Sequence, residues 1–189
     1  GIDRIVAIGG DGTLTGADVL REQWPSLLEE LVASGEIEPA VAERHKKVHL
    51  AGVVGSIDND LVGSDMTVGA NTALHRIVEA IDALSSTAAA HQRTFIIEVM
   101  GRRCGYLALM SAIAGGCDYV FIPEMPPAEV WQEELCDKLR TGRAAGRRDS
   151  IIVVAEGAQD RAGNPISATA VRDLLSDRLG EDVRVTSLG

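Results

Sequence analysis

Short apolar runs alternate with helix-patterned segments along the whole 189-residue chain, and this order constrains the fold most. The runs are continuously apolar, which is typical of parallel strands buried on both faces of a sheet. We therefore predict an α/β fold with three layers: a largely parallel sheet with helices on both faces. The strands are expected at 2–8, 48–54, 95–99, 119–122, 151–155 and 183–188, and the helices at 16–34, after 39, and at 69–87, 104–114, 128–144 and 169–179.

The chain contains no internal repeat, low-complexity tract or linker, so we interpret residues 1–189 as a single globular piece. It opens directly on a predicted strand and stops directly after another one. Natural domains rarely begin on a central strand, so we expect a fragment whose sheet is incomplete.

Charge and composition exclude several classes of protein. The net charge of -10 argues against nucleic acid as a partner, because binding phosphates along a nucleic acid needs a basic surface. No apolar run approaches the ~20 residues that span a bilayer, so no membrane partner is expected. The three cysteines, Cys104, Cys117 and Cys136, match no zinc spacing. They predict free thiols and a reducing, cytoplasmic location.

Polar and glycine-rich segments follow four of the predicted strands. In parallel sheets, ligands bind beyond the carboxyl ends of the strands. We therefore expect these segments to border one cleft. They are residues 9–13, 55–60, 100–105 and 156–157.

The first of these segments, Gly9–Thr13, reads GGDGT and connects a strand to a helix. Its glycines would let backbone N–H groups approach a phosphate, and Asp11 offers a hard oxygen ligand for the Mg²⁺ of a nucleotide. The segment lacks the lysine of a Walker loop and does not match the dinucleotide fingerprint. A plain turn with Thr13 or Thr15 as the helix cap is the alternative.

The second segment, Gly55–Asp60, reads GSIDND and places two carboxylates close together, which like charges disfavour. A function offsets that cost: Asp58 would take a proton from a substrate hydroxyl, and Asp60 would orient it or hold the metal through water. An Asp/Asn-rich surface turn is the alternative.

Arginines and a glutamate complete the predicted cleft. Arg93, Arg102 and Arg103 are expected to surround one strand end, and guanidinium groups match phosphate oxygens. We expect Arg93 and Arg102 to lie together in the cleft rather than to be solvated surface charges. Glu156, after another strand, could accept sugar hydroxyl hydrogens or serve as a turn carboxylate.

Six segments, taken in order, resemble the phosphofructokinase family between residues 9 and 189. They are GGDGT, GSIDNDLVGSDMTVG, HQRTFIIEVMGRRCGYLAL, FIPE, VVAEGA and RVTSLG. The resemblance implies ATP-dependent phosphorylation of fructose 6-phosphate at its 1-hydroxyl in glycolysis, giving fructose 1,6-bisphosphate and ADP. It implies ATP as the donor and Mg²⁺ as the cofactor.

The resemblance carries roles over residue by residue. Gly10, Asp11, Gly12 and Thr13 match the ATP-binding loop, with Asp11 as the Mg²⁺ residue. Asp58 matches the proton acceptor and a substrate contact. Arg93 and Arg184 resemble arginines that bind the 6-phosphate in a neighbouring subunit's site, which implies a homo- or hetero-oligomer with shared active sites and allosteric behaviour. The other matched substrate-binding positions are Ser56, Ile57, Met100, Gly101, Arg102 and Glu156.

Two glycines indicate the phosphoryl donor. Pyrophosphate-dependent relatives usually carry Asp at the position of Gly12 and Lys at that of Gly55, so this chain resembles the ATP type. Residues 21–47 resemble eukaryotic chains, whose amino half is catalytic. The resemblance also implies that an upstream nucleotide-loop segment and a downstream HVQRGG-like sugar-phosphate segment are missing. We therefore expect the isolated segment to be inactive.

Three alternatives stay open at this point. Other GGDGT kinases, which act on NAD or lipids, share the loop but lack the GSIDND and MGRRCGY segments. A non-catalytic regulatory subunit would bind sugar phosphates without turnover, although the presence of Asp11 and Asp58 argues against it. A pyrophosphate-dependent phosphofructokinase is the third alternative.

Overall fold

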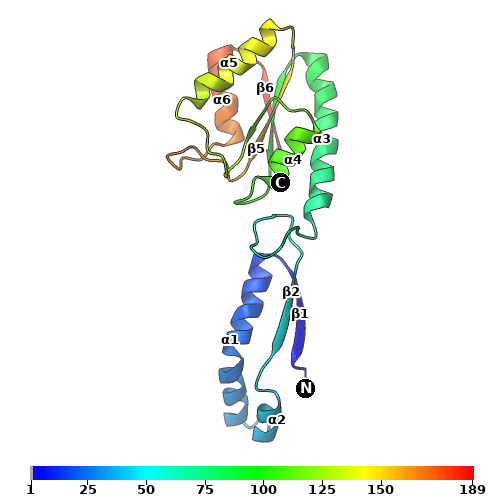
Figure 1. Ribbon diagram of the computed structural model, residues 1–189, viewed down its shortest axis with the longest axis vertical. Helices are drawn as coiled ribbons and strands as arrows, with labels where there is room; N and C mark the ends of the chain where they lie inside the picture. The colour runs from blue at the N-terminus through cyan, green and yellow to red at the C-terminus, as the bar shows by residue number, and fades with distance from the viewer. Residues whose placement is uncertain (1) are drawn as a thin grey trace. The chain divides into compact units, whose positions relative to one another are not determined.

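The computed structural model describes residues 2–189 of the chain, which form two compact units (Figure 1). The first unit extends to Ser56 and the second runs from Ile57 to Gly189. Each unit has its own parallel sheet, with two strands in the first and four in the second.

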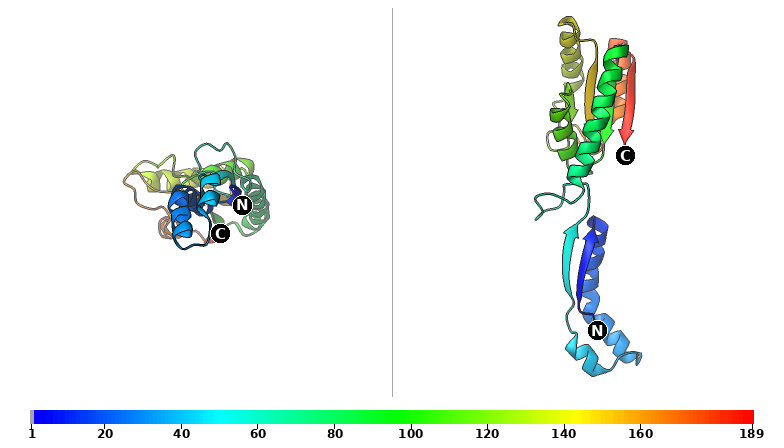
Figure 2. Two further views of the ribbon diagram at one scale, coloured as in Figure 1. Left: turned by 90° about the horizontal axis from the view of Figure 1, so that it is seen from below. Right: turned by 90° about the vertical axis from the view of Figure 1, so that its right-hand side faces the viewer.

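The first unit is a strand–helix–strand arrangement. Its strands, β1 (Arg4–Gly9) and β2 (His49–Val54), pair in parallel from Arg4 opposite His49 to Gly9 opposite Val54. Helix α1 (Asp11–Ala33) packs along both strands, as the right-hand view of Figure 2 shows, and α2 (Pro39–Arg44) follows it. The carboxyl ends of both strands consequently lie side by side, next to the first turn of α1.

The second unit is a three-layer α/β arrangement. Helices α3 and α4 pack against one another, as do α5 and α6, and the sheet lies between the two pairs (Figure 1). The four strands are all parallel, in the order β4-β5-β3-β6. The elements are α3 (Ala70–His91), β3 (Thr94–Val99), α4 (Tyr106–Ala114), β4 (Tyr119–Phe121), α5 (Trp131–Ala144), β5 (Ser150–Ala155), α6 (Ala168–Leu179) and β6 (Val183–Leu188).

The core of the second unit explains why its strands are apolar along their whole length. Every residue of β5 is buried, and β3 is buried at all positions except Glu98. Leu107 from α4 and Leu175 from α6 join the same cluster of buried residues. Burial on both faces holds the register of these strands and therefore fixes where each strand ends.

The strand order places a topological switch between β3 and β5. These strands are neighbours, but the chain leaves β3 into α4 and leaves β5 into α6, on opposite faces of the sheet. In an open parallel sheet, this divergence leaves a crevice at the carboxyl ends of the two strands. The crevice is bordered by the segments that follow Val99 and Ala155.

The α/β class with parallel strands is confirmed, and every predicted strand and helix is present. The strands form two sheets, however, and the expectation that the first two strands are buried on both faces is wrong for the described residues: Val6 is 64% and Ile8 is 69% exposed. Helix α1 also begins at Asp11 rather than near residue 16. Its first turn contains glycine and threonine, which favour helix weakly, so apolar periodicity missed it.

All three cysteines are free thiols, as predicted. Among residues 2–189, no helix combines the length and the apolar character that a bilayer crossing requires.

Candidate active-site and phosphate-binding residues

In the first unit, the GGDGT segment is the start of a long helix. Gly10 is the N-cap residue, Asp11 is the first helical residue, and the amide of Leu14 donates to the Gly10 carbonyl at 3.1 Å. The amides of the first turn have no carbonyl partner within the helix, so this end carries a partial positive charge that suits a phosphate. The predicted loop residues Gly10–Thr13 thus lie together at the carboxyl end of β1.

Close backbone packing joins this helix start to the end of β2. The amide of Gly55 donates to the Gly9 carbonyl at 2.9 Å, and a Cβ atom at Gly55 would lie 3.4 Å from the Gly9 backbone. A Cβ atom at Gly10 would approach Ser56 at 3.9 Å. Predicted nucleotide-binding residues and Ser56 therefore share one edge of the two-stranded sheet.

Gly12 is not required by the packing or backbone of the described residues. A Cβ atom there would meet no atom within 4 Å among residues 2–189, and its φ is not in the left-handed region. Glycine within a helix costs ~1 kcal/mol relative to alanine. A residue that costs stability and fits no internal contact is consistent with space reserved for a ligand.

In the second unit, Glu156 holds the turn that follows β3. Its Oε1 atom accepts hydrogen bonds from the backbone amides of Gly101, at 3.1 Å, and Arg102, at 2.5 Å. Both residues have positive φ, 144° for Gly101 and 53° for Arg102, which is an unfavourable conformation for arginine. Glu156 follows β5, so this contact spans the crevice between β3 and β5.

The same turn is packed too tightly for a side chain at Gly157. A Cβ atom there would collide with the carbonyl oxygen of Arg102. The adjacent positions Gly101, Arg102 and Glu156, all predicted as substrate-binding residues, therefore form one rigid group at the switch point.

The charges of Glu156 and Arg102 act on the Asp58 carboxyl. Partial burial raises the pKa of the Asp58 carboxyl, and the charges of Asp60 and Glu156 raise it further, whereas the Arg102 guanidinium opposes them. A carboxylate with a raised pKa binds a proton more strongly than an ordinary aspartate, which suits a general base. The predicted proton acceptor is thus electrostatically coupled to two of the predicted substrate-binding residues.

Asn59 has a structural task between the two aspartates. Its Oδ1 accepts a hydrogen bond from the Thr67 amide at 3.0 Å, and its Nδ2 donates to the Asp65 carbonyl at 3.3 Å. These bonds close the loop 59–67, which begins directly after Asp58. Asn59 was not among the predicted site residues.

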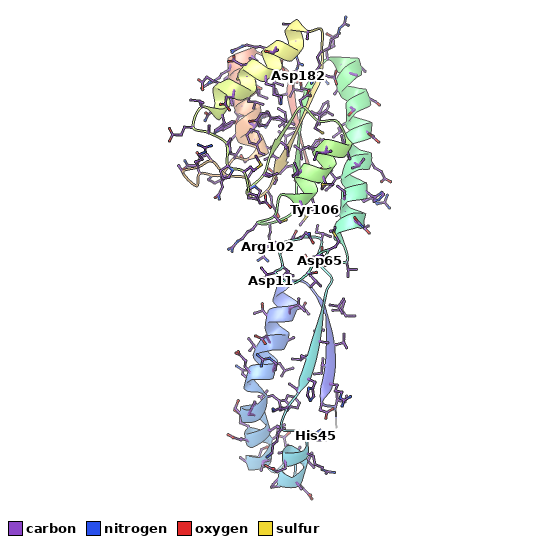
Figure 3. The ribbon with its side chains drawn as sticks, in the orientation of Figure 1. Asp11, His45, Asp65, Arg102, Tyr106 and Asp182 are labelled. Carbon is purple, nitrogen blue, oxygen red and sulfur yellow. The ribbon has the colours of Figure 1, made fainter. Side chains whose placement is uncertain are left out.

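Arg93 and Arg102 lie at opposite ends of β3, so the expectation that they share one cleft is wrong. Arg93 precedes the strand and Arg102 follows it, and a six-residue strand is about 20 Å long. Figure 3 shows Arg102 near Tyr106 at one end of this unit and Asp182 at the other. The sequence places arginines before and after this strand, but it does not indicate which end of the strand faces the ligand.

Arg93 instead lies beside Arg184. Both guanidinium groups contact Asp182: Arg93 Nε lies 2.5 Å from Oδ2, and Arg184 Nε lies 3.1 Å from Oδ1. The two residues predicted to bind a 6-phosphate are therefore brought together, at the amino ends of β3 and β6. Asp182 was not predicted as a site residue. The only sequence feature that could have indicated it is its position two residues before Arg184.

A complete metal-binding cage is not present in the described part of the chain. No group of three or more His, Cys, Asp or Glu side chains among residues 2–189 could hold an ion. Mg²⁺ in nucleotide sites is commonly bound by one or two carboxylates, with phosphates and water completing its shell. A single carboxylate at the start of α1 fits that kind of site.

Comparison with known proteins identifies the class. The protein-family model described as Phosphofructokinase matches residues 1–189, and the chain belongs to this family. It is 57% identical to the liver-type ATP-dependent 6-phosphofructokinase of Pongo abelii and 56% identical to that of Homo sapiens, over all 189 residues in both cases. A solved phosphofructokinase from Saccharomyces cerevisiae matches the whole chain with a TM-score of 0.94 at 49% identity.

These relatives are much longer than the chain. It covers 24% of the two liver-type enzymes and 25% of the yeast chain. The similarity thus extends over the whole of this chain but over only about a quarter of each relative.

Proposed function

We propose that the complete protein carrying this segment transfers the γ-phosphoryl group of ATP to the 1-hydroxyl of fructose 6-phosphate. The observation that carries the proposal is the 56% identity, over all 189 residues, to a human ATP-dependent 6-phosphofructokinase. The chain spans about a quarter of that enzyme, so we assign the activity to the complete protein and expect the isolated segment to be inactive. The enzyme would act in glycolysis in the cytoplasm.

Asp58 acts as the proton acceptor in this mechanism. It takes the proton of the 1-hydroxyl as the oxygen attacks the γ-phosphorus, and its raised pKa supports that role. Glu156 keeps Gly101 and Arg102 in position, so that this turn orients the sugar together with Ser56, Ile57 and Met100. Positioning and electrostatics supply most of the rate enhancement in phosphoryl transfer.

Asp11 and the first turn of α1 bind the nucleotide. The amides around Gly10, Gly12 and Thr13 would contact the phosphates, and Asp11 would hold the Mg²⁺. The ion, when bound, neutralises charge that develops on the phosphate oxygens.

Arg93 and Arg184 bind the 6-phosphate of a sugar held mainly by a neighbouring subunit. Their pairing at the amino ends of the strands, remote from Arg102, supports a separate anion site rather than a place in the β3–β5 crevice. The active enzyme is then an oligomer with shared sites.

A donor comparison with the complete enzyme tests the proposal. Fructose 6-phosphate should be phosphorylated with ATP, and the product should be the 1,6-bisphosphate by ³¹P NMR. Pyrophosphate should not replace ATP. Turnover with pyrophosphate alone, or sugar-phosphate binding without turnover, would refute the proposed activity.

Removing Glu156 is predicted to weaken sugar binding. In Glu156→Ala the amides of Gly101 and Arg102 lose their shared acceptor, and the KM for fructose 6-phosphate should rise about tenfold, because charge-assisted hydrogen bonds contribute about 1.5–3 kcal/mol. Steady-state kinetics would measure this. Glu156→Gln keeps an acceptor oxygen and should lie between Ala and the native enzyme. An equal rise in KM in both variants would show that the charge of Glu156, and not its hydrogen bonds to the turn, sets the affinity for the sugar.

Neutralising Asp60 is predicted to shift the pH profile. The Asp60 charge raises the pKa of Asp58, so Asp60→Asn should lower that pKa. Asp58 must be ionised to accept a proton, and it loses this ability as the pH falls through its pKa. The acid limb of kcat/KM should therefore move to lower pH in Asp60→Asn. Asp65→Asn, in the same loop, is the control and should leave the limb in place; a shift to higher pH in Asp60→Asn would contradict the assignment.

A further inference from the structure

Two consecutive carboxylates, Glu181 and Asp182, lie between the end of α6 and the start of β6. Asp182 contacts both Arg93 and Arg184. The amide of Thr94, which follows Arg93, donates to the Asp182 carbonyl at 3.4 Å. Main chain and side chain of Asp182 therefore both connect β6 to the start of β3.

Glu181 is held by a more buried arginine from α5. Arg143 binds it in a bidentate manner: Nε lies 3.0 Å from Oε1 and Nη2 lies 2.9 Å from Oε2. The Thr94 hydroxyl donates to Oε2 at 2.5 Å. Bidentate arginine–carboxylate pairs fix orientation as well as adding energy.

The same guanidinium also reaches β3 and β5. Arg143 Nη2 donates to the Thr94 hydroxyl at 3.0 Å, and Nη1 donates to the Asp149 carbonyl at 3.0 Å and the Ser150 hydroxyl at 3.1 Å. Arg143 thus ties together the amino ends of three strands, including β3, which Arg93 precedes, and β6, which contains Arg184.

Burial separates the tasks of the two carboxylates. The side chains of Arg143 and Glu181 are 26% and 18% exposed, whereas Asp182 is 46% exposed. A well-bonded, largely buried pair is suited to holding a fixed geometry, and a more exposed carboxylate contributes less to folding.

We propose that Arg143, Glu181 and Asp182 are positioning residues for the Arg93–Arg184 pair. Two adjacent guanidinium groups repel each other. The shared Asp182 carboxylate offsets this repulsion and keeps both groups directed toward one phosphate position. The Arg143–Glu181 pair fixes the turn that carries Asp182. Phosphate then meets two arginines that are already ordered, which lowers the entropy cost of binding. The inference rests on the proposed function, in which this pair binds the sugar phosphate.

Asp182→Asn in the complete oligomeric enzyme tests the inference. The KM for fructose 6-phosphate should rise about tenfold, while kcat and the KM for ATP should stay within about twofold, because the 6-phosphate is held equally in the ground state and the transition state. Asp182→Glu restores the charge and should recover much of the affinity. Glu133→Gln, which breaks the exposed Glu133–Arg178 pair in the same unit, is the matched control and should change none of these constants.

Arg143→Lys is the second variant. Lysine cannot reproduce the bidentate contact, so the KM for fructose 6-phosphate should rise about threefold, and combining it with Asp182→Asn should give less than the product of the two effects. Thermal unfolding is measured in parallel to separate this shift from a loss of folded enzyme.

The outcomes separate the two proposals. An unchanged or lower KM for fructose 6-phosphate in Asp182→Asn, with a native enzyme that phosphorylates the sugar normally, would overturn the positioning role alone. A native enzyme without fructose 6-phosphate-dependent turnover would overturn the proposed function and this inference with it. A loss in Asp182→Asn that Asp182→Glu fails to reduce would also count against the role of the charge.

Discussion

Replacing Asp58 with serine in the complete enzyme is expected to lower kcat by about 10³-fold or more, with little change in the KM for fructose 6-phosphate. Serine cannot accept the hydroxyl proton at neutral pH, but it leaves the sugar-binding turn at Gly101 and Arg102 intact. The loss should therefore lie in the chemical step. Steady-state kinetics and single-turnover phosphoryl transfer would both measure it.

A control in the same loop makes the Asp58 result specific. Asp65→Ser changes a carboxylate on the segment closed by Asn59 and should leave kcat within about twofold of the native value, as expected for an exposed surface residue. Near-normal turnover in Asp58→Ser would remove Asp58 from the role of base.

Replacing Asp11 with asparagine is expected to lower kcat/KM for ATP by about 10²-fold or more, because an uncharged amide holds the nucleotide's metal ion weakly. Part of this loss should be recovered at high Mg²⁺ concentration, since the remaining oxygen can still coordinate. A magnesium titration of initial rates would measure the shift.

Asp18→Asn is the matched control on the same helix. Asp18 is an exposed carboxylate paired with Arg21, and its neutralisation should leave the magnesium dependence unchanged. If Asp11→Asn and Asp18→Asn behave alike, Asp11 has no special part in binding the metal nucleotide.

The fold class could be predicted because burial leaves a clear pattern. Strands such as β5, with every residue buried, produce continuous apolar runs that no half-exposed strand would show. Strands β1 and β2 give equally apolar runs, yet they form a separate sheet with exposed valine and isoleucine. Sequence pattern reports how apolar a strand is, and it does not report which other strand it pairs with.

The carboxyl-edge residues could be predicted for a topological reason. Every parallel strand delivers its following loop to the same edge of its sheet, so Met100–Arg102 and Glu156 had to lie together once β3 and β5 were neighbours. Arg93 lies before its strand, and the same rule places it at the opposite edge.

The positioning contacts could not be predicted. Arg143 reaches Glu181 across 38 positions of sequence, and Thr94 reaches it across 87, and neither pair carries a local motif. Glu156 was predicted as a sugar contact, but its bonds to the Gly101 and Arg102 amides depend on a turn with positive φ at arginine, which side-chain chemistry alone does not indicate.

The central claim is that Asp58 accepts the proton of the sugar hydroxyl and Asp11 serves the metal nucleotide. The most direct test is a crystal structure of the complete enzyme with fructose 6-phosphate, Mg²⁺ and a non-hydrolysable ATP analogue. We predict an Asp58 carboxylate oxygen about 2.6–3.2 Å from the 1-hydroxyl, and Asp11 bound to the nucleotide's Mg²⁺ directly or through one water. A structure in which Asp58 lies beyond reach of that hydroxyl, even through one water, or in which Asp11 lies away from the phosphates, would contradict it.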